Sequence, residues 1–300
     1  MWSKILIFGG ALLFLVIIWF SFQNAKELVP SALTTLFTTD SSFSIPNGFT
    51  SGLSLSDKKG VAEVSLDELG DFSPASGLVT ISKRGDSLST ADINYEYIII
   101  TANADNAQPV NISNWSLQSM ISDEWIGLPQ GVDSYVAGEV NEVGDIYLRP
   151  GEEAIVATKK SPVGVSFRVN QCSGYLSSTQ TFEPAISKQC VDPKDIVPAT
   201  IENLKLYGDE CVTFAQNLNR CTYVTSSTRG YDTLSPACLA YIQPRLTYNY
   251  CVEQHVHDAD FYKAKEWRIF LNQDHILWRE NYEVIRLLDE QFRTIDVITY

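Results

Sequence analysis

The stretch Asn94–Ser119 constrains the fold of this chain most, because it joins an apolar run, a polar turn and a second short run. The first run, Tyr95–Thr101, places Ile98 and Ile100 on one face if it forms a strand, since the side chains of a strand alternate. A polar turn then separates it from the second run, Pro109–Ile112. This order predicts two antiparallel strands joined by a turn.

The same stretch resembles the lamin tail domain, an immunoglobulin-like β-sandwich marked by a Glu-Tyr-Ile-x-Ile strand and a Leu-Ser-Gly-Trp turn. Here the two motifs are Glu96–Ile100 and Ile112–Trp115. Asn114 replaces the turn glycine, and asparagine tolerates the left-handed backbone region well. Ile99 stands at an outward position that is usually polar, which indicates that another segment covers it. The resemblance implies a recognition module without a chemistry of its own.

Further short motifs extend the resemblance to about 78–170 and 267–300. Arg149-Pro150-Gly151 is typical of a type II turn, in which glycine supplies the positive φ. Strands are predicted at Leu78–Ser82, Trp125–Pro129, Ala154–Thr158, Trp267–Leu271, Ile276–Trp278, Val284–Asp289 and Thr294–Tyr300. The last two resemble the closing hairpin of the family, with Phe292 in place of its turn glycine. By resemblance, the buried core includes Ile98, Ile100, Trp115, Trp125, Trp267, Trp278 and Leu287.

The N-terminal run Ile5–Phe22 is apolar and as a helix would span about 27 Å, close to the hydrocarbon thickness of a bilayer. Trp2 and Trp19 stand near its ends, where interfacial tryptophans are favoured, and Lys4 supplies a positive cytoplasmic flank. A cleavable signal peptide is the alternative, but the residues that follow offer only a poor cleavage site. We expect residues 1–22 to anchor a bacterial single-pass plasma-membrane protein, with its N-terminus in the cytoplasm.

The remaining chain divides into a linker and one interrupted domain. Residues 23–76 are predicted to be a flexible linker, because they are rich in serine and threonine and show no sustained periodicity. A mainly β domain, the sandwich, is expected at 77–300, interrupted by a cysteine-rich helical insertion at about 172–262. The closing strands should therefore belong to the same sandwich as Tyr95–Thr101, and the insertion or the linker should cover Ile99.

All six cysteines lie in the second half of the chain: Cys172, Cys190, Cys211, Cys221, Cys238 and Cys251. An even number without a C-x-x-C pair is typical of disulfides in an oxidising compartment rather than of a zinc site. Six cysteines permit many pairings. The spacing favours a helical hairpin with nested bridges, namely Cys211–Cys251 outside and Cys221–Cys238 inside, and a separate loop closed by Cys172 and Cys190.

Two helices are predicted within the insertion. Asp209 is a candidate N-cap for Glu210–Leu218, and Ser235-Pro236 is a typical start of a second helix that Pro244 should end. Tyrosines crowd the same region: Tyr223, Tyr231, Tyr241, Tyr248 and Tyr250. Buried packing is one interpretation of these rings, and an aromatic surface for a glycan or protein partner is the other.

The segment His255–Asp260 is the one metal-like cluster of the sequence. On a strand its alternate side chains could face zinc. Because no fourth spaced ligand is evident, we prefer a polar connector in which Asp258 or Asp260 caps a short helix. No catalytic motif of known spacing occurs, and the adjacent Glu152 and Glu153 would point apart on a strand. We therefore expect no catalytic, cofactor-binding or metal-binding residues.

The charge balance narrows the class of partner. A net charge of −14 without a lysine- or arginine-rich cluster argues against nucleic-acid binding. We expect a membrane-anchored, non-catalytic module that binds a protein or an envelope glycan outside the plasma membrane. The alternative is an accessory or catalytic subunit of a cell-wall hydrolase, which would require a deep pocket with convergent titratable groups.

Overall fold

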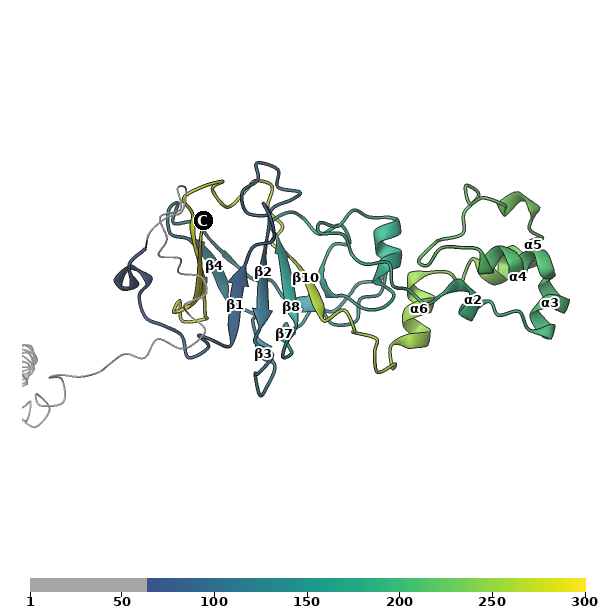
Figure 1. Ribbon diagram of the computed structural model, residues 1–300, viewed down its shortest axis with the longest axis horizontal. Coiled ribbons are helices and arrows are strands. Elements are labelled where there is room, and N and C mark those ends of the chain that lie inside the picture. Colours follow the sequence, from purple (N-terminus) through teal and green to yellow (C-terminus); the bar gives the residue numbers. More distant parts are fainter. Residues whose placement is uncertain (1–63) are drawn as a thin grey trace, which may run out of the picture. The chain divides into compact units, whose positions relative to one another are not determined.

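The computed structural model describes residues 64–300, which form a mainly β structure with several short helices (Figure 1). The strands are β1 (Val79–Ser82), β2 (Tyr97–Ala102), β3 (Val110–Asn111), β4 (Ser116–Ser119), β5 (Trp125–Gly127), β6 (Gly131–Val132), β7 (Tyr147–Leu148), β8 (Glu153–Ala157), β9 (Ser166–Arg168), β10 (Glu266–Phe270), β11 (Val284–Leu288) and β12 (Thr294–Thr299). The helices are η2 (Leu66–Leu69), η3 (Ser173–Ser178), α2 (Pro193–Ile196), α3 (Ile201–Tyr207), α4 (Asp209–Gln216), η4 (Tyr231–Thr233), α5 (Pro236–Ile242) and α6 (Tyr248–His255).

The predicted anchor, residues 1–22, and the predicted linker as far as residue 63 lie outside the described residues. Between residues 64 and 300, no helix is long and apolar enough to cross a membrane.

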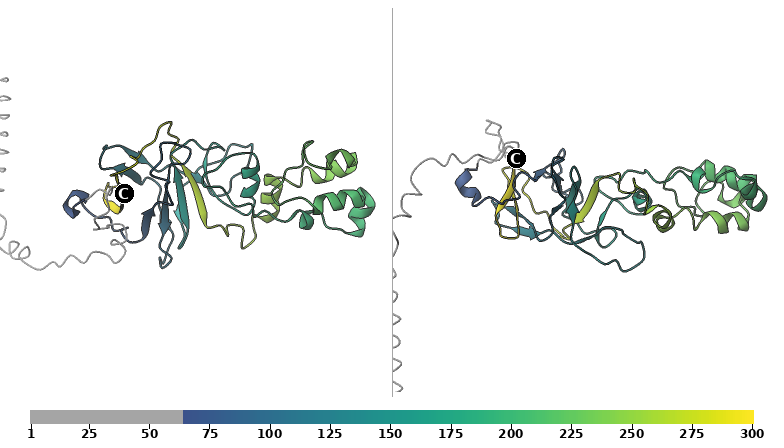
Figure 2. Two further views of the ribbon diagram at one scale, coloured as in Figure 1. Left: turned by 45° about the horizontal axis from the view of Figure 1, so that its top comes forward. Right: turned by 90° about the horizontal axis from the view of Figure 1, so that it is seen from below.

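The strands form two main sheets and one small sheet; Figure 2 shows the strands and the helices from two further directions. The six-stranded sheet has the order β1-β2-β8-β10-β9-β6, the four-stranded sheet has the order β12-β11-β4-β5, and β3 pairs with β7. Most neighbours are antiparallel, but β8 pairs with β10, and β6 with β9, in parallel. We call residues 64–171 and 263–300 the sheet body, and residues 172–262 the insertion.

The two main sheets enclose one hydrophobic core. Side chains of β2 and β10 meet side chains of β4, β11 and β12 there, because alternate residues of each strand face the core. Six residues expected in the core are buried in it: Ile98, Ile100, Trp115, Trp267, Trp278 and Leu287. Burying a large apolar side chain stabilises a fold by about 1.5–3 kcal/mol relative to leaving it exposed.

A second hydrophobic core lies on the opposite face of the six-stranded sheet. Ile99, which stands between the inward-facing Ile98 and Ile100, is only 4% exposed and belongs to this second core. The insertion contributes to the same core, through Tyr175 of η3 and Tyr248 of α6. The prediction that Ile99 is covered is therefore confirmed.

The insertion leaves the sheet body after β9 and returns to it at β10. These strands are antiparallel neighbours, with Trp267 opposite Arg168, so both ends of the insertion meet at one place in the sheet. The closing strands β11 and β12 pair with each other, and β11 also pairs with β4. The expectation that the closing strands rejoin the first half, rather than form a separate domain, is confirmed.

The two runs of the opening stretch do not pair with each other, so that prediction is wrong. Strand β2 has β1 on one edge and β8 on the other, which leaves no edge for a hairpin partner. The second run pairs instead with β7, through Val110 and Asn111. The chain then continues into β4 of the facing sheet.

The segment Ile276–Trp278 is not a strand, contrary to the prediction. The main-chain N–H groups of Leu277 and Trp278 donate to the carboxylate of Glu96, at 3.0 and 3.1 Å. A buried side chain thus takes the place of the neighbouring strand that the prediction assumed. Burial raises the pKa of Glu96, although these hydrogen bonds oppose the shift.

The sheet body begins earlier than the sequence predicts. Within the expected linker, Ser73 donates its N–H to the carbonyl of Thr294 at 2.8 Å. Leu69 is buried against Val284 and Val297, on the four-stranded sheet. The predicted linker boundary at residue 76 is therefore wrong. The serine-rich composition of the segment does not indicate that Leu69 packs on the sheet.

Trp125 is not part of the core, contrary to the prediction. It lies on the edge strand β5 and is 60% exposed. Its ring meets that of Phe292 edge-on, with 6.1 Å between the ring centroids. The three-residue strand β5 places its tryptophan away from the facing sheet.

Two predicted turns adopt the backbone conformation that their residues suggest. Asn114 has φ 63° and Gly151 has φ 74°. The N–H of Glu152 donates to the carbonyl of Arg149 at 2.9 Å, which closes the turn around Pro150 and Gly151. Phe292 also has a positive φ, 60°, a conformation that costs a bulky residue more than it costs asparagine.

The insertion helices follow their capping residues in part. Helix α5 begins at Pro236, the hydroxyl of Ser235 accepts the N–H of Cys238 at 3.1 Å, and the helix ends before Pro244. These features confirm the prediction. Helix α4 has Gly208 rather than Asp209 at its N-cap. The helical part has a small core of its own, made of Val197, Cys211, Ala215, Val224, Cys238, Ile242 and Leu246.

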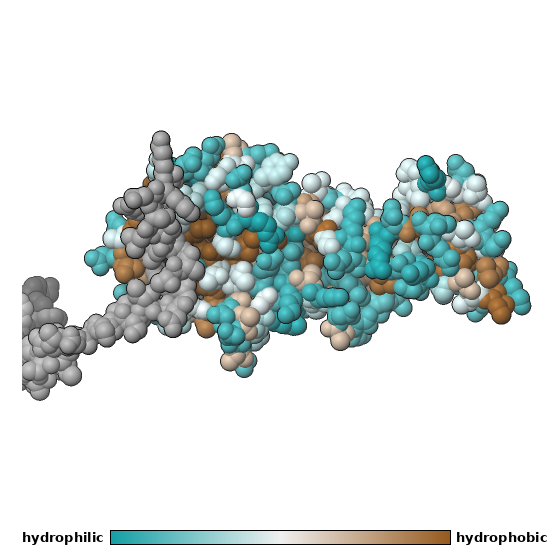
Figure 3. All heavy atoms as spheres, in the orientation of Figure 1, coloured by the Kyte–Doolittle hydropathy of each residue, from teal (hydrophilic) through white to brown (hydrophobic). Residues whose placement is uncertain are grey.

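The surface of the insertion is mostly hydrophilic, with apolar residues exposed towards its far end (Figure 3). Helix α3 buries none of its residues. Its Ile201 and Leu206 are 74% and 59% exposed.

Candidate functional site

Three disulfides fix the insertion. They join Cys172 to Cys251, Cys190 to Cys221 and Cys211 to Cys238. All six cysteines are buried, and none of them is free. Disulfide bonding is confirmed, but each of the three predicted pairs is wrong.

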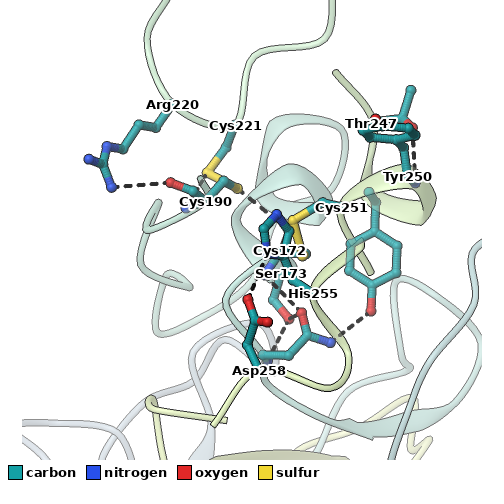
Figure 4. The surroundings of a disulfide bond; sticks show 12 residues. Cys172, Ser173, Cys190, Arg220, Cys221, Thr247, Tyr250, Cys251, His255 and Asp258 are labelled. Carbon is teal, nitrogen blue, oxygen red and sulfur yellow. Dashed lines mark hydrogen bonds and ion pairs between the residues drawn. A yellow bond between two sulfur atoms is a disulfide. The ribbon is translucent and has the colours of Figure 1, made fainter. Parts of the chain in front are cut away.

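The predicted pairing fails because the helices do not form a simple hairpin. Helix α6 packs on the second core, beside the sheet body, instead of pairing with α4. Cys251 on α6 therefore reaches Cys172 at the start of η3 (Figure 4). The partner that this leaves for Cys211 is Cys238 on α5, inside the small helical core.

A cavity of about 610 Å³ opens where the insertion meets the sheet body. Its lining comes from the residues after β9, from the loop around Cys190, from Arg220 and from the chain that leads into β10. The bridge between Cys190 and Cys221 holds two of these segments together (Figure 4). We call it the junction cavity.

Two charged residues of the junction cavity are already engaged by the protein. Arg220 donates to the carbonyl of Cys190 at 3.2 Å and lies 3.4 Å from the carboxylate of Asp192. Glu266 accepts a hydrogen bond of 2.6 Å from the guanidinium of Arg268. These contacts fix the wall of the cavity.

Other polar groups of the junction cavity have no partner within residues 64–300. Lys263 and Asp260 form no ion pair there, and their side chains form no hydrogen bond. The side-chain amide nitrogen of Gln171 is buried without an acceptor. Leaving a buried donor unmet costs about 1–3 kcal/mol. A ligand with an acceptor oxygen would remove that cost.

A buried ion pair positions the segment that carries Lys263. Arg168 on β9 is 2% exposed, pairs with the buried Glu152 and lies 3.0 Å from the carboxylate of Asp133. Its guanidinium stacks over the ring of Tyr262, 4.1 Å from the centroid. The hydroxyl of Tyr262 donates to the carbonyl of Asp133 at 3.0 Å. The residue before Lys263 is thus held from two sides.

The metal-like cluster does not lie on a strand. His255 ends α6, and its Nδ1 is 2.7 Å from the carboxylate of Asp258 (Figure 4). The helix expected after Asp260 is a series of turns. In the described part of the chain, the other ring nitrogen of His255 meets no hydroxyl or thiol, and no group of three or more His, Cys, Asp or Glu residues is placed to hold a metal ion.

Two tyrosines of the insertion make packing contacts, Tyr248 with the sheet body and Tyr241 within the insertion. Tyr248 is buried, accepts a hydrogen bond from Asn170 at 3.1 Å and donates to the carbonyl of Tyr135 at 3.1 Å. Tyr241 stacks on Tyr207 with 3.9 Å between centroids. These contacts favour the interpretation of buried packing over that of an aromatic binding surface.

Sequence reasoning missed the residues of the junction cavity. Gln171 and Lys263 belong to no motif, and Asp260 is singled out only as part of the metal-like cluster; the fold brings the three together from the two ends of the insertion. No protein-family model, no curated protein and no solved structure matches this chain. The site is therefore interpreted from its geometry.

Proposed function

We propose that this chain is a membrane-anchored, extracytoplasmic recognition module of the lamin tail type, without catalytic activity, that binds a protein or glycan of the bacterial envelope. The observation that carries the proposal is the junction cavity, where Gln171, Asp260 and Lys263 offer unpaired polar groups to a ligand. A few well-placed polar groups are what orient a ligand in a binding site.

Two further observations support the family and the location. Ile98 and Ile100 enter a core between two packed sheets, and Trp115 follows a left-handed Asn114, as the lamin-tail motif would require. Three buried disulfides are typical of proteins that fold in an oxidising compartment. The anchor at Ile5–Phe22 remains a proposal from the sequence.

Photocrosslinking in living cells tests the binding function. A photoreactive amino acid replaces Gln189, an exposed residue of the junction cavity, in the full-length chain. The expected result is a discrete crosslinked envelope component. The matched control carries the same amino acid at Tyr147, which is 50% exposed on β7. The same crosslinked species at both positions, or none at Gln189, would contradict binding through this cavity.

A cell-wall hydrolase subunit is the second candidate, because the junction cavity holds two carboxylates. Asp260 and Glu266 both line it, and a pair of carboxylates that flanks a bond can cleave a glycoside. The test is release of soluble fragments from labelled cell wall by the full-length chain. Activity that is lost in Asp260→Asn and in Glu266→Gln, but kept in Asp105→Asn, would replace the recognition proposal with the hydrolase.

A further inference from the structure

A second pocket, of about 440 Å³, lies apart from the junction cavity and shares no lining residue with it. Three loops form it: the one that leads into β2, the one that follows β8 and the one that follows η3. We call it the lysine pocket, after Lys159 and Lys160.

The two lysines lack direct partners. Within residues 64–300, neither ammonium group forms an ion pair or a hydrogen bond. Lys159 is partly buried, and this burial lowers its pKa, although the charges of Glu183 and Asp92 oppose the shift. A partly desolvated cation without a direct partner is stabilised by an anion that enters its pocket.

Two carboxylates balance the charge of the lining, but only one of them is free to bind. Asp92 accepts the main-chain N–H and the side-chain amide of Asn94, both at 2.9 Å. Glu183 forms no ion pair or hydrogen bond through its side chain in the described part of the chain. With two lysines against two acids, the lining has no net charge. Such a lining attracts a multiply charged anion less than two lysines alone would, and it matches a neutral ligand with separated charges.

The remaining lining suits the uncharged part of such a ligand. The side chains of Gln180 and Thr181 line the pocket and have no hydrogen-bond partner within residues 64–300. The ring of Tyr95 is 54% exposed and offers an apolar surface. Amide and hydroxyl groups beside an aromatic ring can bind a peptide unit and a short side chain.

We propose that the lysine pocket binds a small zwitterion with a free carboxylate and a free amine, that is, an amino acid or a short peptide. The carboxylate is held by Lys159 and Lys160, and the amine by Glu183. This inference goes beyond the proposed function and does not depend on it, because the two sites share no residue.

Calorimetric titration of the full-length, oxidised chain in detergent micelles tests the inference, with dialanine as the probe. Dialanine should bind, whereas N-acetyl-dialanine and dialanine amide should each bind about tenfold more weakly or worse, since each lacks one charge. Inorganic phosphate should bind more weakly than dialanine. Lys159→Gln should weaken dialanine binding by about tenfold or more, and Lys159→Arg should keep most of it. Lys205→Gln, at an exposed position of α3, should have no effect.

Glu183→Gln tests the contact with the amine of the ligand separately from the contacts with its carboxylate. It should weaken the binding of dialanine and leave that of N-acetyl-dialanine unchanged. The inference would be overturned if dialanine did not bind, if free and blocked peptides bound equally, or if phosphate bound more tightly than dialanine. It would also be overturned if Lys159→Gln and Glu183→Gln both left the affinity for dialanine unchanged. Near-ultraviolet circular dichroism shows that each variant is folded. A failure here leaves the crosslinking result at Gln189 untouched, so the two proposals are tested separately.

Discussion

Buried carboxylates of the sheet body are held chiefly by main-chain N–H groups. Glu96 accepts from residues 277 and 278, and Glu283 accepts from Arg279 and Val284 at 3.0 and 2.8 Å. Asp296 accepts from Ile81 at 2.7 Å. The bonds of Glu96 and Asp296 join segments far apart in the chain, so no local pattern predicts them. Acidic residues are mostly exposed in folded proteins, but Glu96, Glu283 and Asp296 are buried.

Asp296 gives the first prediction. Burial raises its pKa to about 6 from the ordinary value of 3.8. The folded carboxyl therefore holds its proton at a pH where the unfolded one has lost it, so stability falls as the pH rises from 3.8 to about 6. This loss amounts to roughly 2–3 kcal/mol.

Asp296→Asn should remove that pH dependence. We expect the free energy of unfolding of the variant, relative to the native chain, to rise by roughly 2–3 kcal/mol between pH 4 and pH 7. Denaturant titration at several pH values measures it. Asp105→Asn, at an exposed position, is the control and should show no such trend. A constant difference between the Asp296 variant and the native chain would show that the carboxyl is not perturbed.

Ile99 gives the second prediction at the residue scale. Because Ile99 is buried in the second core, an aspartate at position 99 would be a buried charge without a partner. Ile99→Asp should lower the free energy of unfolding by roughly 2 kcal/mol or more. Tyr147→Asp, at a half-exposed strand position, should cost only a few tenths of a kcal/mol. Similar losses in both variants, measured by denaturant titration, would count against burial of Ile99 by the insertion.

At the scale of elements, the sequence predicts strands with a strong alternating pattern and fails where a side chain replaces a strand partner. Strands β2, β8, β10, β11 and β12 lie within two residues of their predicted ends. The segment at 276–278 fails because Glu96 binds its N–H groups. Helices α3 and α6 were not predicted, and both follow a threonine N-cap, Thr200 and Thr247. Those caps are the pattern that could have revealed them.

The disulfide between Cys211 and Cys238 gives a prediction at this scale. Both cysteines lie in the small core of α2–α5, which is separate from the second core. The chain-entropy treatment gives on the order of 3–4 kcal/mol for a bridge that closes a loop of this length. We expect Cys211→Ser with Cys238→Ser to accelerate hydrogen exchange in α4 and α5, and to leave β2 protected.

The matching control removes the bridge that ties the insertion to the sheet body. Cys172→Ser with Cys251→Ser should accelerate exchange in η3 and α6 as well, because both elements belong to the second core. If loss of the Cys211–Cys238 bridge instead exposes β2 and β11 to exchange, the insertion and the sheet body unfold as one unit. Fast exchange confined to the insertion would show that it loses structure first.

At the scale of the whole molecule, the order of its parts is predictable but the binding sites are not. The resemblance places the closing strands with the opening ones, and their pairing through β4 agrees. Gln171 and Lys263 both line the junction cavity, and the fold brings their segments together because β9 and β10 are adjacent in the sheet. The residues that line this cavity come from segments far apart in the sequence, so none of these segments indicates the site alone.

The orientation in the membrane gives the last prediction. Lys4 precedes the apolar run Ile5–Phe22, and positive residues favour the cytoplasmic side. The three disulfides of the insertion require an oxidising environment to form. Both arguments predict that residues 64–300 lie outside the plasma membrane. Protease added to intact cells or spheroplasts should therefore digest these residues, while a cytoplasmic marker protein survives.

The same samples, alkylated before lysis and separated without reductant, should carry no label on any of the six cysteines. Protection from the protease together with labelled thiols would place the domain in the cytoplasm. This result would contradict the proposed binding of an envelope component.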